Sequence, residues 1–287
     1  IIGFQVVGSM VPMLRFRRAV FGVLSGFVFG IAWPGVIQAD TDSNPSSPGV
    51  EQPDGPVSVE ALLNDAYEAR DLAETVRLTL VMIDQLGTGQ DGLSTTRDAW
   101  LEQGSANGDR FELEVAVALA EESAARATGV NARGDAFTQL GRALRWLGYM
   151  DAEDDGLERA VIAFRSALGE WTQESTPQFW AFTQNILGVT LVDLFDRNGD
   201  TGLLHQSVTA LHAALEVHTF EDAPLDWAAS QNNLGISLYW LGVIEEDTAI
   251  LRQAAAAYHN AMKVRTRELE PIGWAKQQNN LSNIYMI

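Results

Sequence analysis

The chain of 287 residues contains no cysteine, and its only lysines are Lys263 and Lys276. Without cysteine it can form no disulfide, use no thiol nucleophile and hold no zinc through thiolates. Acidic residues outnumber basic ones by 38 to 19, which gives a formal net charge of −19. A chain this poor in positive charge argues against nucleic acid as a partner and against binding to an anionic membrane surface.

Sequence motifs of the common enzyme classes are missing as well. The chain has no GxxxxGK[ST] phosphate loop, no HExxH, no glycine-flanked nucleophilic serine and no GxGxxG. Because 46% of the residues are hydrophobic and 20% are charged, the composition fits a soluble globular chain rather than a disordered one. We therefore predict a folded, non-catalytic protein that uses no cofactor.

Two weak metal-ligand patterns are present. Asp196, Asn198 and Asp200 have the alternating spacing of a calcium loop, but the expected glycine is displaced and no glutamate stands at the twelfth position. Helix capping is the favoured interpretation of these residues. A second pattern is a set of histidines that could form a weak metal site, although a solvated helix face is favoured. These histidines are His205, His212 and His259.

The first 39 residues have the pattern of a secretory signal peptide. Basic residues between Arg15 and Arg18 precede an uncharged apolar run over residues 19–37, and the small residue Ala39 follows. We therefore expect a periplasmic or secreted protein. Because the apolar run is long enough to span a bilayer, an inner-membrane anchor formed by residues 19–37 is the alternative. Residues 40–56 are polar and rich in proline, which predicts a disordered linker.

An internal repeat of 47 residues dominates the rest of the chain. Trp180, Trp227 and Trp274 follow one another at steps of 47 residues. The same step connects Pro177, Pro224 and Pro271; Ala167, Ala214 and Ala261; and Leu187, Leu234 and Leu281. A fixed period in this range is typical of stacked supersecondary units.

Each repeat unit has the pattern of two helices. In one unit, Pro224 suits a first helical residue, Leu234 and Leu238 recur at helical spacing, and Gly242 is expected to end the helix. Small residues such as Gly235 are expected where two helices approach closely. In each of three units, one aspartate is expected near the N-terminus of the second helix, where its carboxylate can cap free amides. They are Asp155, Asp200 and Asp247.

This pattern resembles the tetratricopeptide repeat (TPR) family. Leu234-Gly235 is followed by an Ala, aromatic, Ala stripe at Ala254, Tyr258 and Ala261, and the run APLDWAASQNNLG is similar to an extended repeat variety of bacterial proteins. The resemblance covers about 109–287. It implies an all-α superhelix of antiparallel helix pairs whose concave groove binds peptides or protein surfaces.

The two ends of this array are less regular. Residues 57–108 match the repeat poorly and predict an N-terminal helical cap or a degenerate repeat, as terminal units of stacks are usually atypical. Residues 109–287 are predicted to form the array itself, with a last repeat that stops inside its first helix. That helix either serves as a cap or belongs to a longer natural chain.

The face of each first helix opposite its buried leucine is the candidate binding surface. A rotation of about 100° per residue, starting from Leu187, identifies this face in each unit, and the resemblance places it in the concave groove. Asparagine amides can both donate to and accept from a peptide backbone, and arginines can hold a carboxylate. The predicted groove residues are Arg142, Arg145, Asn185, Val189, Asn232, Ile236, Tyr239 and Asn279.

Alternatives exist for these residues and for the function. The asparagines can instead form a structural ladder or keep the groove hydrated, and the arginines can pair with acids of the same chain, such as Asp193 or Glu158. The leading function is an exported, non-catalytic scaffold that binds a protein or peptide ligand. The alternative is a regulatory or recruitment region of a larger enzyme or sensor that continues beyond residue 287.

Overall fold

The computed structural model describes residues 58–151 and 154–286. The predicted signal peptide (1–39) and linker (40–56) lie outside these residues. Every regular element in the described part is an α-helix, as predicted. The helices are α3 (Val59–Glu68), α4 (Leu72–Leu86), α5 (Gly89–Asn107), α6 (Arg110–Arg126), α7 (Val130–Met150), α8 (Gly156–Glu170), α9 (Pro177–Asn198), α10 (Thr201–Leu215), α11 (Pro224–Ile244), α12 (Thr248–Met262) and α13 (Pro271–Tyr285).

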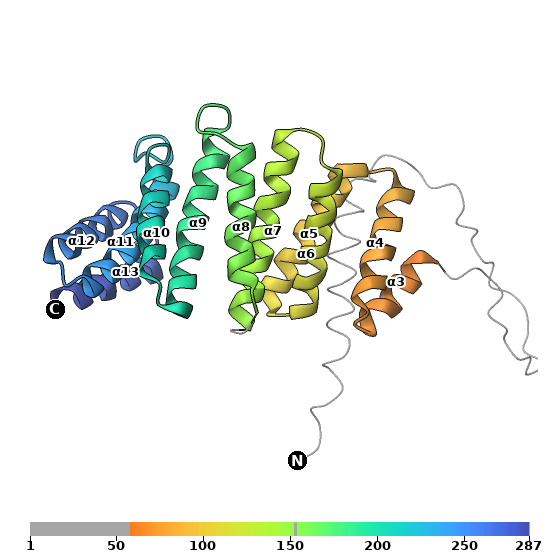
Figure 1. The fold of residues 1–287 in the computed structure, drawn as a ribbon, viewed down its shortest axis with the longest axis horizontal. Coiled ribbons are helices and arrows are strands. Elements are labelled where there is room, and N and C mark those ends of the chain that lie inside the picture. The colour runs from red at the N-terminus through yellow and green to blue at the C-terminus, as the bar shows by residue number, and fades with distance from the viewer. Residues whose placement is uncertain (1–57, 152–153, 287) are drawn as a thin grey trace, which may run out of the picture.

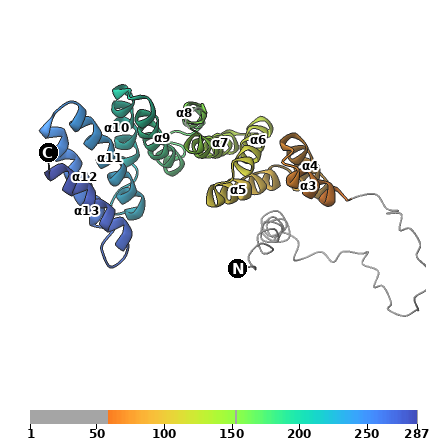
Figure 2. The ribbon, with the colours of Figure 1, turned by 90° about the horizontal axis from the view of Figure 1, so that it is seen from below.

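The helices form one continuous solenoid. Each packs mainly against its neighbours in the sequence, so that α5–α6, α7–α8, α9–α10 and α11–α12 are successive helix pairs. They follow one another along the longest axis of the molecule, from α3 at one end to α12 and α13 at the other (Figure 1). The row is curved: α8 lies on its outer side, whereas α5 and α13 lie on the opposite, inner side (Figure 2). In the described residues no helix is both long and apolar enough to cross a bilayer.

The 47-residue repeat is explained by the contact between the two helices of a pair. A Cβ atom added to Gly235 of α11 would lie 2.7 Å from the Tyr258 ring of α12. The corresponding distance is 2.6 Å between Gly141 and Phe164, and 2.7 Å between Gly188 and Leu211. Since real Cβ atoms do not approach so closely, only glycine lets these helices pack at this distance.

Prolines and aspartates begin the helices much as the sequence predicts. Pro224 occupies the first turn of α11, and the repeat-related prolines do so in α9 and α13. Asp200 caps α10 by accepting a hydrogen bond from the Gly202 amide, and Asp247 caps α12 in the same way. Asp155 stands at the N-cap of α8 but makes no side-chain capping bond.

The prediction that Gly242 ends its helix is wrong. Helix α11 continues to Ile244. A Cβ atom at Gly242 would lie 2.9 Å from Leu251 of α12, so this glycine serves the close approach of the two helices within a continuing helix.

The N-terminal helices extend the solenoid without the sequence repeat. Helix α5 packs against α6 as the first helices of later pairs pack against the second. The guanidinium of Arg97 in α5 is 1% exposed and forms ion pairs of 2.8 and 2.7 Å with Asp98 and Asp135. Its Nη1 also donates to Ser123 of α6. A large charged residue therefore fills space inside this helix pair.

Candidate binding site

The predicted groove arginines have different surroundings. Arg145 forms a 2.7 Å ion pair with Asp193 of α9, and it also donates to the Tyr149 hydroxyl. Partial burial and the nearby Asp193 carboxylate raise the pKa of Tyr149 to about 12. Arg142 donates to Gln139 at 2.7 Å, and among residues 58–151 and 154–286 it has no acidic partner in an ion pair. Arg145 is thus held by the protein's own acid, whereas Arg142 forms no ion pair in the described residues.

The predicted asparagine Asn185 belongs to a hydrogen-bond network between α9 and α11. Its Nδ2 donates to the Ser230 hydroxyl at 2.5 Å, and its Oδ1 accepts from Asn233 at 3.1 Å. The Ser230 oxygen also lies 3.0 Å from Nδ1 of His218. Asn185 therefore connects two repeats, which is the structural ladder that the sequence left open.

The remaining predicted groove residues lie outside this network. Asn232 donates weakly to Asn233 at 3.3 Å, and the half-buried Tyr239 packs edge-on against Trp240, with ring centroids 5.4 Å apart. Val189 and Ile236 are half-buried, and Asn279 is exposed on α13.

A cavity of about 350 Å³, here called the inner cavity, lies between consecutive repeats. Helices α7 and α9 and the start of α11 supply most of its walls, together with the segments that follow α8 and α10. Of the predicted groove residues, Arg142 lines it. The lining residues are Asp135, Thr138, Gln139, Arg142, Trp171, Gln178, Phe179, Phe182, His218 and Asp226.

Aromatic rings form the apolar part of the inner cavity. Trp171 is 3% exposed and stacks on Phe179, with ring centroids 4.9 Å apart and an interplanar angle of 25°. Phe179 and Phe182 remain 56% and 44% exposed. Exposed phenylalanines that gather at a concave site are typical of binding surfaces.

The Trp171 side chain also carries an unsatisfied donor. Its ring packs over the backbone of α7 at Gly134, where an added Cβ would lie 2.4 Å from the indole. Its Nε1 is buried and has no hydrogen-bond partner in the described part of the protein. A buried N–H group without an acceptor is uncommon, because its desolvation is not offset.

His218 adds an imidazole to the cavity wall. Burial lowers the pKa of this imidazole, although the carboxylate of Asp226 acts in the opposite direction, so the neutral ring is favoured at pH 7. The Ser230 hydroxyl accepts from Asn185 and lies 3.0 Å from Nδ1 of His218, where the tautomer of the ring sets which of the two atoms donates.

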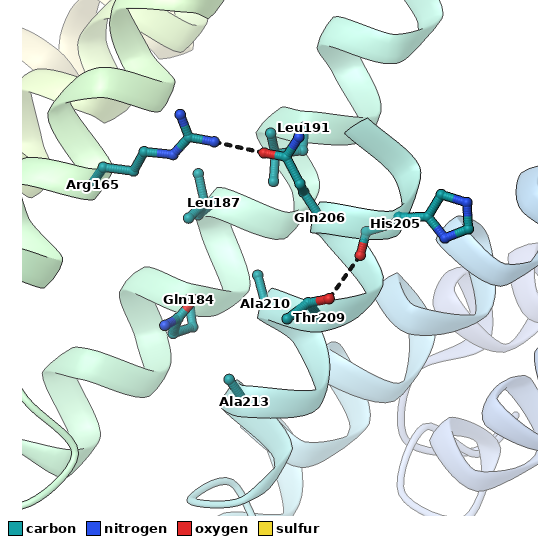
Figure 3. A pocket seen from close by; sticks show the side chains of 9 residues that line it. All are labelled: Arg165, Gln184, Leu187, Leu191, His205, Gln206, Thr209, Ala210 and Ala213. Carbon is teal, nitrogen blue, oxygen red and sulfur yellow. Dashed lines mark hydrogen bonds between the residues drawn. The ribbon is translucent and has the colours of Figure 1, made fainter. Parts of the chain in front are cut away.

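A second cavity, the outer cavity, lies between the second helices α8 and α10. It has a volume of about 320 Å³, and Leu187 and Leu191 of α9 form its apolar floor. Arg165 of α8 donates to Gln206 of α10 at 2.6 Å across it, and Thr209 donates to the His205 carbonyl (Figure 3). The leucines that face it are core residues of the repeat, and four of its polar residues, Arg165, His205, Gln206 and Thr209, already have partners.

Most residues of the inner cavity could not be predicted from the sequence, because they differ from the residues at equivalent positions of the other repeats. Steps of 47 residues relate Phe179 to Asp226 and Phe182 to Ala229, so the exposed aromatic rings occur in one unit only. Trp171 and His218 are also one step apart. Bulky residues that replace small or polar ones at repeat-equivalent positions are the signal that would have identified the cavity.

The candidate metal ligands cap a helix, contact a carboxylate or are exposed to solvent. Asp200 caps α10, and Asn198 accepts from the Asp200 amide. His212 and His259 are exposed, as predicted, and His205 lies 3.0 Å from Glu245. In the described ranges there is no group of three or more histidine or acidic residues that could hold a metal ion.

No family model and no curated relative matches the chain. Among solved structures, the chain is similar to BtubC (BKLC) from P. vanneervenii, with a TM-score of 0.48 and 17% sequence identity. The match covers 80% of this chain and 84% of BtubC.

Proposed function

We propose that the protein is an exported, non-catalytic scaffold that binds a protein or peptide ligand on the inner side of its solenoid. The observation that carries the proposal is the inner cavity, where exposed phenylalanines and the guanidinium of Arg142 lie together. Apolar side chains beside charged and amide groups match the composition of a peptide, which has both.

The curvature and the charge of the chain support the same proposal. Curved helical solenoids use their concave surfaces for binding, and the sequence resemblance to tetratricopeptide repeats implies such a use. With a net charge of −19, the chain favours partners that are neutral or basic overall. Export rests on the basic and apolar pattern of residues 13–39, and N-terminal sequencing of the protein produced in a Gram-negative host tests it.

A pull-down from periplasmic extract with paired surface variants tests the binding function. The inner variant carries Arg142→Glu and Phe182→Asp, and the outer variant carries Arg165→Glu and Ile162→Asp, which make the same kinds of change at more exposed side chains on α8. We expect the wild type and the outer variant to capture the same partner and the inner variant to lose it.

The captured partner is then purified and its binding is repeated with isolated components. Loss of the partner from the outer variant alone would place the binding surface on the other side of the solenoid. Equal capture by all three proteins would exclude both surfaces. Circular dichroism checks that each variant keeps the wild-type helix content.

A further inference from the structure

We propose that the edge of the solenoid where α7, α9 and α11 end is a second interaction surface, which binds a basic, amphipathic segment of a partner protein. We call this surface the aromatic edge. It is distinct from the inner cavity, whose phenylalanines lie near the start of α9, so the inference goes beyond the proposed function. The aromatic edge consists of Trp146, Tyr149, Asp196, Trp240, Ile244 and Glu246.

The first observation is that large apolar side chains are exposed at this edge. Trp146 and Tyr149 of α7 are 41% and 50% exposed, and Trp240 and Ile244 of α11 are 39% and 42% exposed. The two tryptophans are separated by two steps of 47 residues, so they occupy the same position in their repeats. Exposed aromatic residues that gather on one surface are typical of protein interfaces.

Helix α9 connects the two aromatic groups into one surface. Asp193, which is one step from each tryptophan, pairs with Arg145 of α7 at 2.7 Å, and the Arg145 guanidinium lies 4.9 Å from the centroid of the Tyr149 ring. Farther along α9, the ring centroids of Phe195 and Trp240 are 6.2 Å apart. Contacts between neighbouring repeats therefore hold the aromatic groups in place before a partner binds, which lowers the entropic cost of binding.

The second observation is the negative charge beside these rings. The turns from the first to the second helix of each pair directly follow the part of the helix that carries the rings. These turns contain nine acidic residues and one arginine, over residues 151–155, 196–200 and 245–247. The aromatic edge is therefore bordered by carboxylates in three consecutive repeats.

The chain's own basic residues leave some of these carboxylates unpaired. Arg197 donates to the main-chain carbonyls of Asp154 and Gly148 rather than to a carboxylate. Asp196 and Glu246 are exposed, and neither forms an ion pair within residues 58–151 and 154–286. Their charges are available to a partner.

This combination of groups identifies the chemistry of the partner. A lysine or arginine can pair with an exposed carboxylate, and its cationic group is also attracted to the face of a tryptophan ring. Apolar side chains of the same segment then cover the exposed rings. A second copy of the chain carries the same net charge of −19 and is repelled, and anionic lipid and nucleic acid are repelled for the same reason.

Isothermal titration calorimetry with a defined probe tests the proposal. The probe is a synthetic amphipathic peptide with leucines on one helical face and lysines on the other, and a control peptide carries glutamate in place of every lysine. We expect the lysine peptide to bind about tenfold more tightly than the glutamate peptide. Its affinity should fall as salt is added, because salt screens the attraction.

A pair of aromatic variants locates the binding. Trp240→Ala should weaken the lysine peptide about tenfold, since tryptophans often carry much of the energy of an interface. Phe220→Ala is the matched control, because Phe220 is 45% exposed but lies between α10 and α11, at the opposite edge of the solenoid. Its affinity for the peptide should stay within about twofold of the wild type.

A pair of charge variants separates local attraction from the effect of net charge. Asp196→Asn combined with Glu246→Gln should weaken the lysine peptide about fivefold. Glu174→Gln combined with Glu221→Gln removes the same total charge from exposed residues at the opposite edge and should leave the affinity within about twofold of the wild type. Both variants change exposed side chains to close isosteres, so the test holds even if Trp240→Ala fails to fold.

Three outcomes would overturn the aromatic edge as a site for a basic segment. The first is equal affinity for the lysine and glutamate peptides. The second is unchanged lysine-peptide affinity in both Trp240→Ala and the Asp196 and Glu246 double variant. The third is a wild-type dimer in analytical ultracentrifugation that Trp240→Ala converts to a monomer, which would assign the surface to a second copy. The proposed function stands in all three cases, because the pull-down with the inner variant tests it separately.

Discussion

Helix pairs α5–α6 and α7–α8 make equivalent contacts with opposite distributions of side-chain volume. A Cβ atom added to Gly104 of α5 would lie 2.9 Å from Leu113 of α6, and one added to Gly148 of α7 would lie 2.9 Å from Leu157 of α8. These contacts match when α5–α6 is shifted by 44 residues onto α7–α8. The same shift relates Arg97 to Gly141 and Ala120 to Phe164.

In α7–α8 the bulk comes from the second helix, where Phe164 fills the space above Gly141. In α5–α6 it comes from the first helix, where the buried Arg97 faces small residues of α6 such as Ser123. Both pairs therefore fill the space between their two helices, although with different residues, because protein interiors tolerate neither voids nor overlap. A search for identical residues at a 47-residue step misses α5–α6 because both the step and the residues differ.

The largest effect is expected in the regular pairs. Leu234 of α11 is 5% exposed in the core shared with α12, so Leu234→Asp should destabilise the protein by about 4 kcal/mol, because a charge is buried without a partner. Urea unfolding followed by circular dichroism measures this change. Leu225→Asp is the control, since Leu225 is 69% exposed on the same helix and should change stability by less than about 0.5 kcal/mol.

Substitutions of Arg97 test whether filled volume stabilises the irregular pair α5–α6. Arg97→Ala removes both the volume and the partner of two carboxylates, and should cost about 3 kcal/mol. Arg97→Met keeps most of the volume, and Asp98 and Asp135 are 49% and 41% exposed, so they can rehydrate and the loss should be clearly smaller.

Arg77→Ala is the matched control, since Arg77 pairs with Glu74 on the surface with 57% and 39% exposure and should leave the unfolding free energy close to that of the wild type. If Met and Ala at position 97 cost the same, charge pairing rather than volume holds α5–α6 together, and the comparison with α7–α8 fails.

The sequence predicts the fold well because the fold is repetitive. Gly235 and Leu234 occupy positions that the regular pairs need for close packing, and so glycine and leucine recur there at a constant step. The start of α11 at Pro224 follows from the same logic, because a proline is tolerated in the first turn. The continuation of α11 beyond Gly242 does not follow, because a glycine can either end a helix or admit a neighbour, and only the position of Leu251 decides.

The candidate site is predicted only in part for the opposite reason. A binding pocket in a repeat protein must differ from the other repeats, so Phe179 and Phe182 carry no periodic signal. The sequence identified Arg142, which lines the inner cavity. It could not tell Arg145 from Arg142, because the ion pair of Arg145 with Asp193 joins two helices whose relative position is set by packing.

The next largest effect is expected in the pH dependence of the unfolding free energy, through His218 at the inner cavity. Burial lowers the pKa of His218 below its ordinary value of 6.5. The unfolded chain therefore takes up a proton first on acidification, so stability is complete above about pH 6.5 and falls as the pH drops through that value toward the folded-state pKa.

One group can contribute at most about 1.4 kcal/mol per pH unit. We expect His218→Gln to remove this part of the pH dependence of the unfolding free energy and the exposed His212→Gln to leave it unchanged. Identical pH profiles for the wild type and His218→Gln would show that the ring gains its proton as easily in the folded chain as in the unfolded chain.

The smallest effect on stability distinguishes the two neighbouring arginines. Arg145 is 20% exposed and pairs with Asp193, which is 15% exposed, so Arg145→Ala should cost about 1 kcal/mol, and most of that cost should disappear in the Asp193→Ala background. Arg142 has no such pair among the described residues, so Arg142→Ala should change the unfolding free energy by less than about 0.5 kcal/mol. A substitution that leaves the fold intact and still weakens ligand binding is what distinguishes a binding residue from a structural one. A loss of stability in Arg142→Ala as large as that in Arg145→Ala would instead make both arginines part of the contact between α7 and its neighbours.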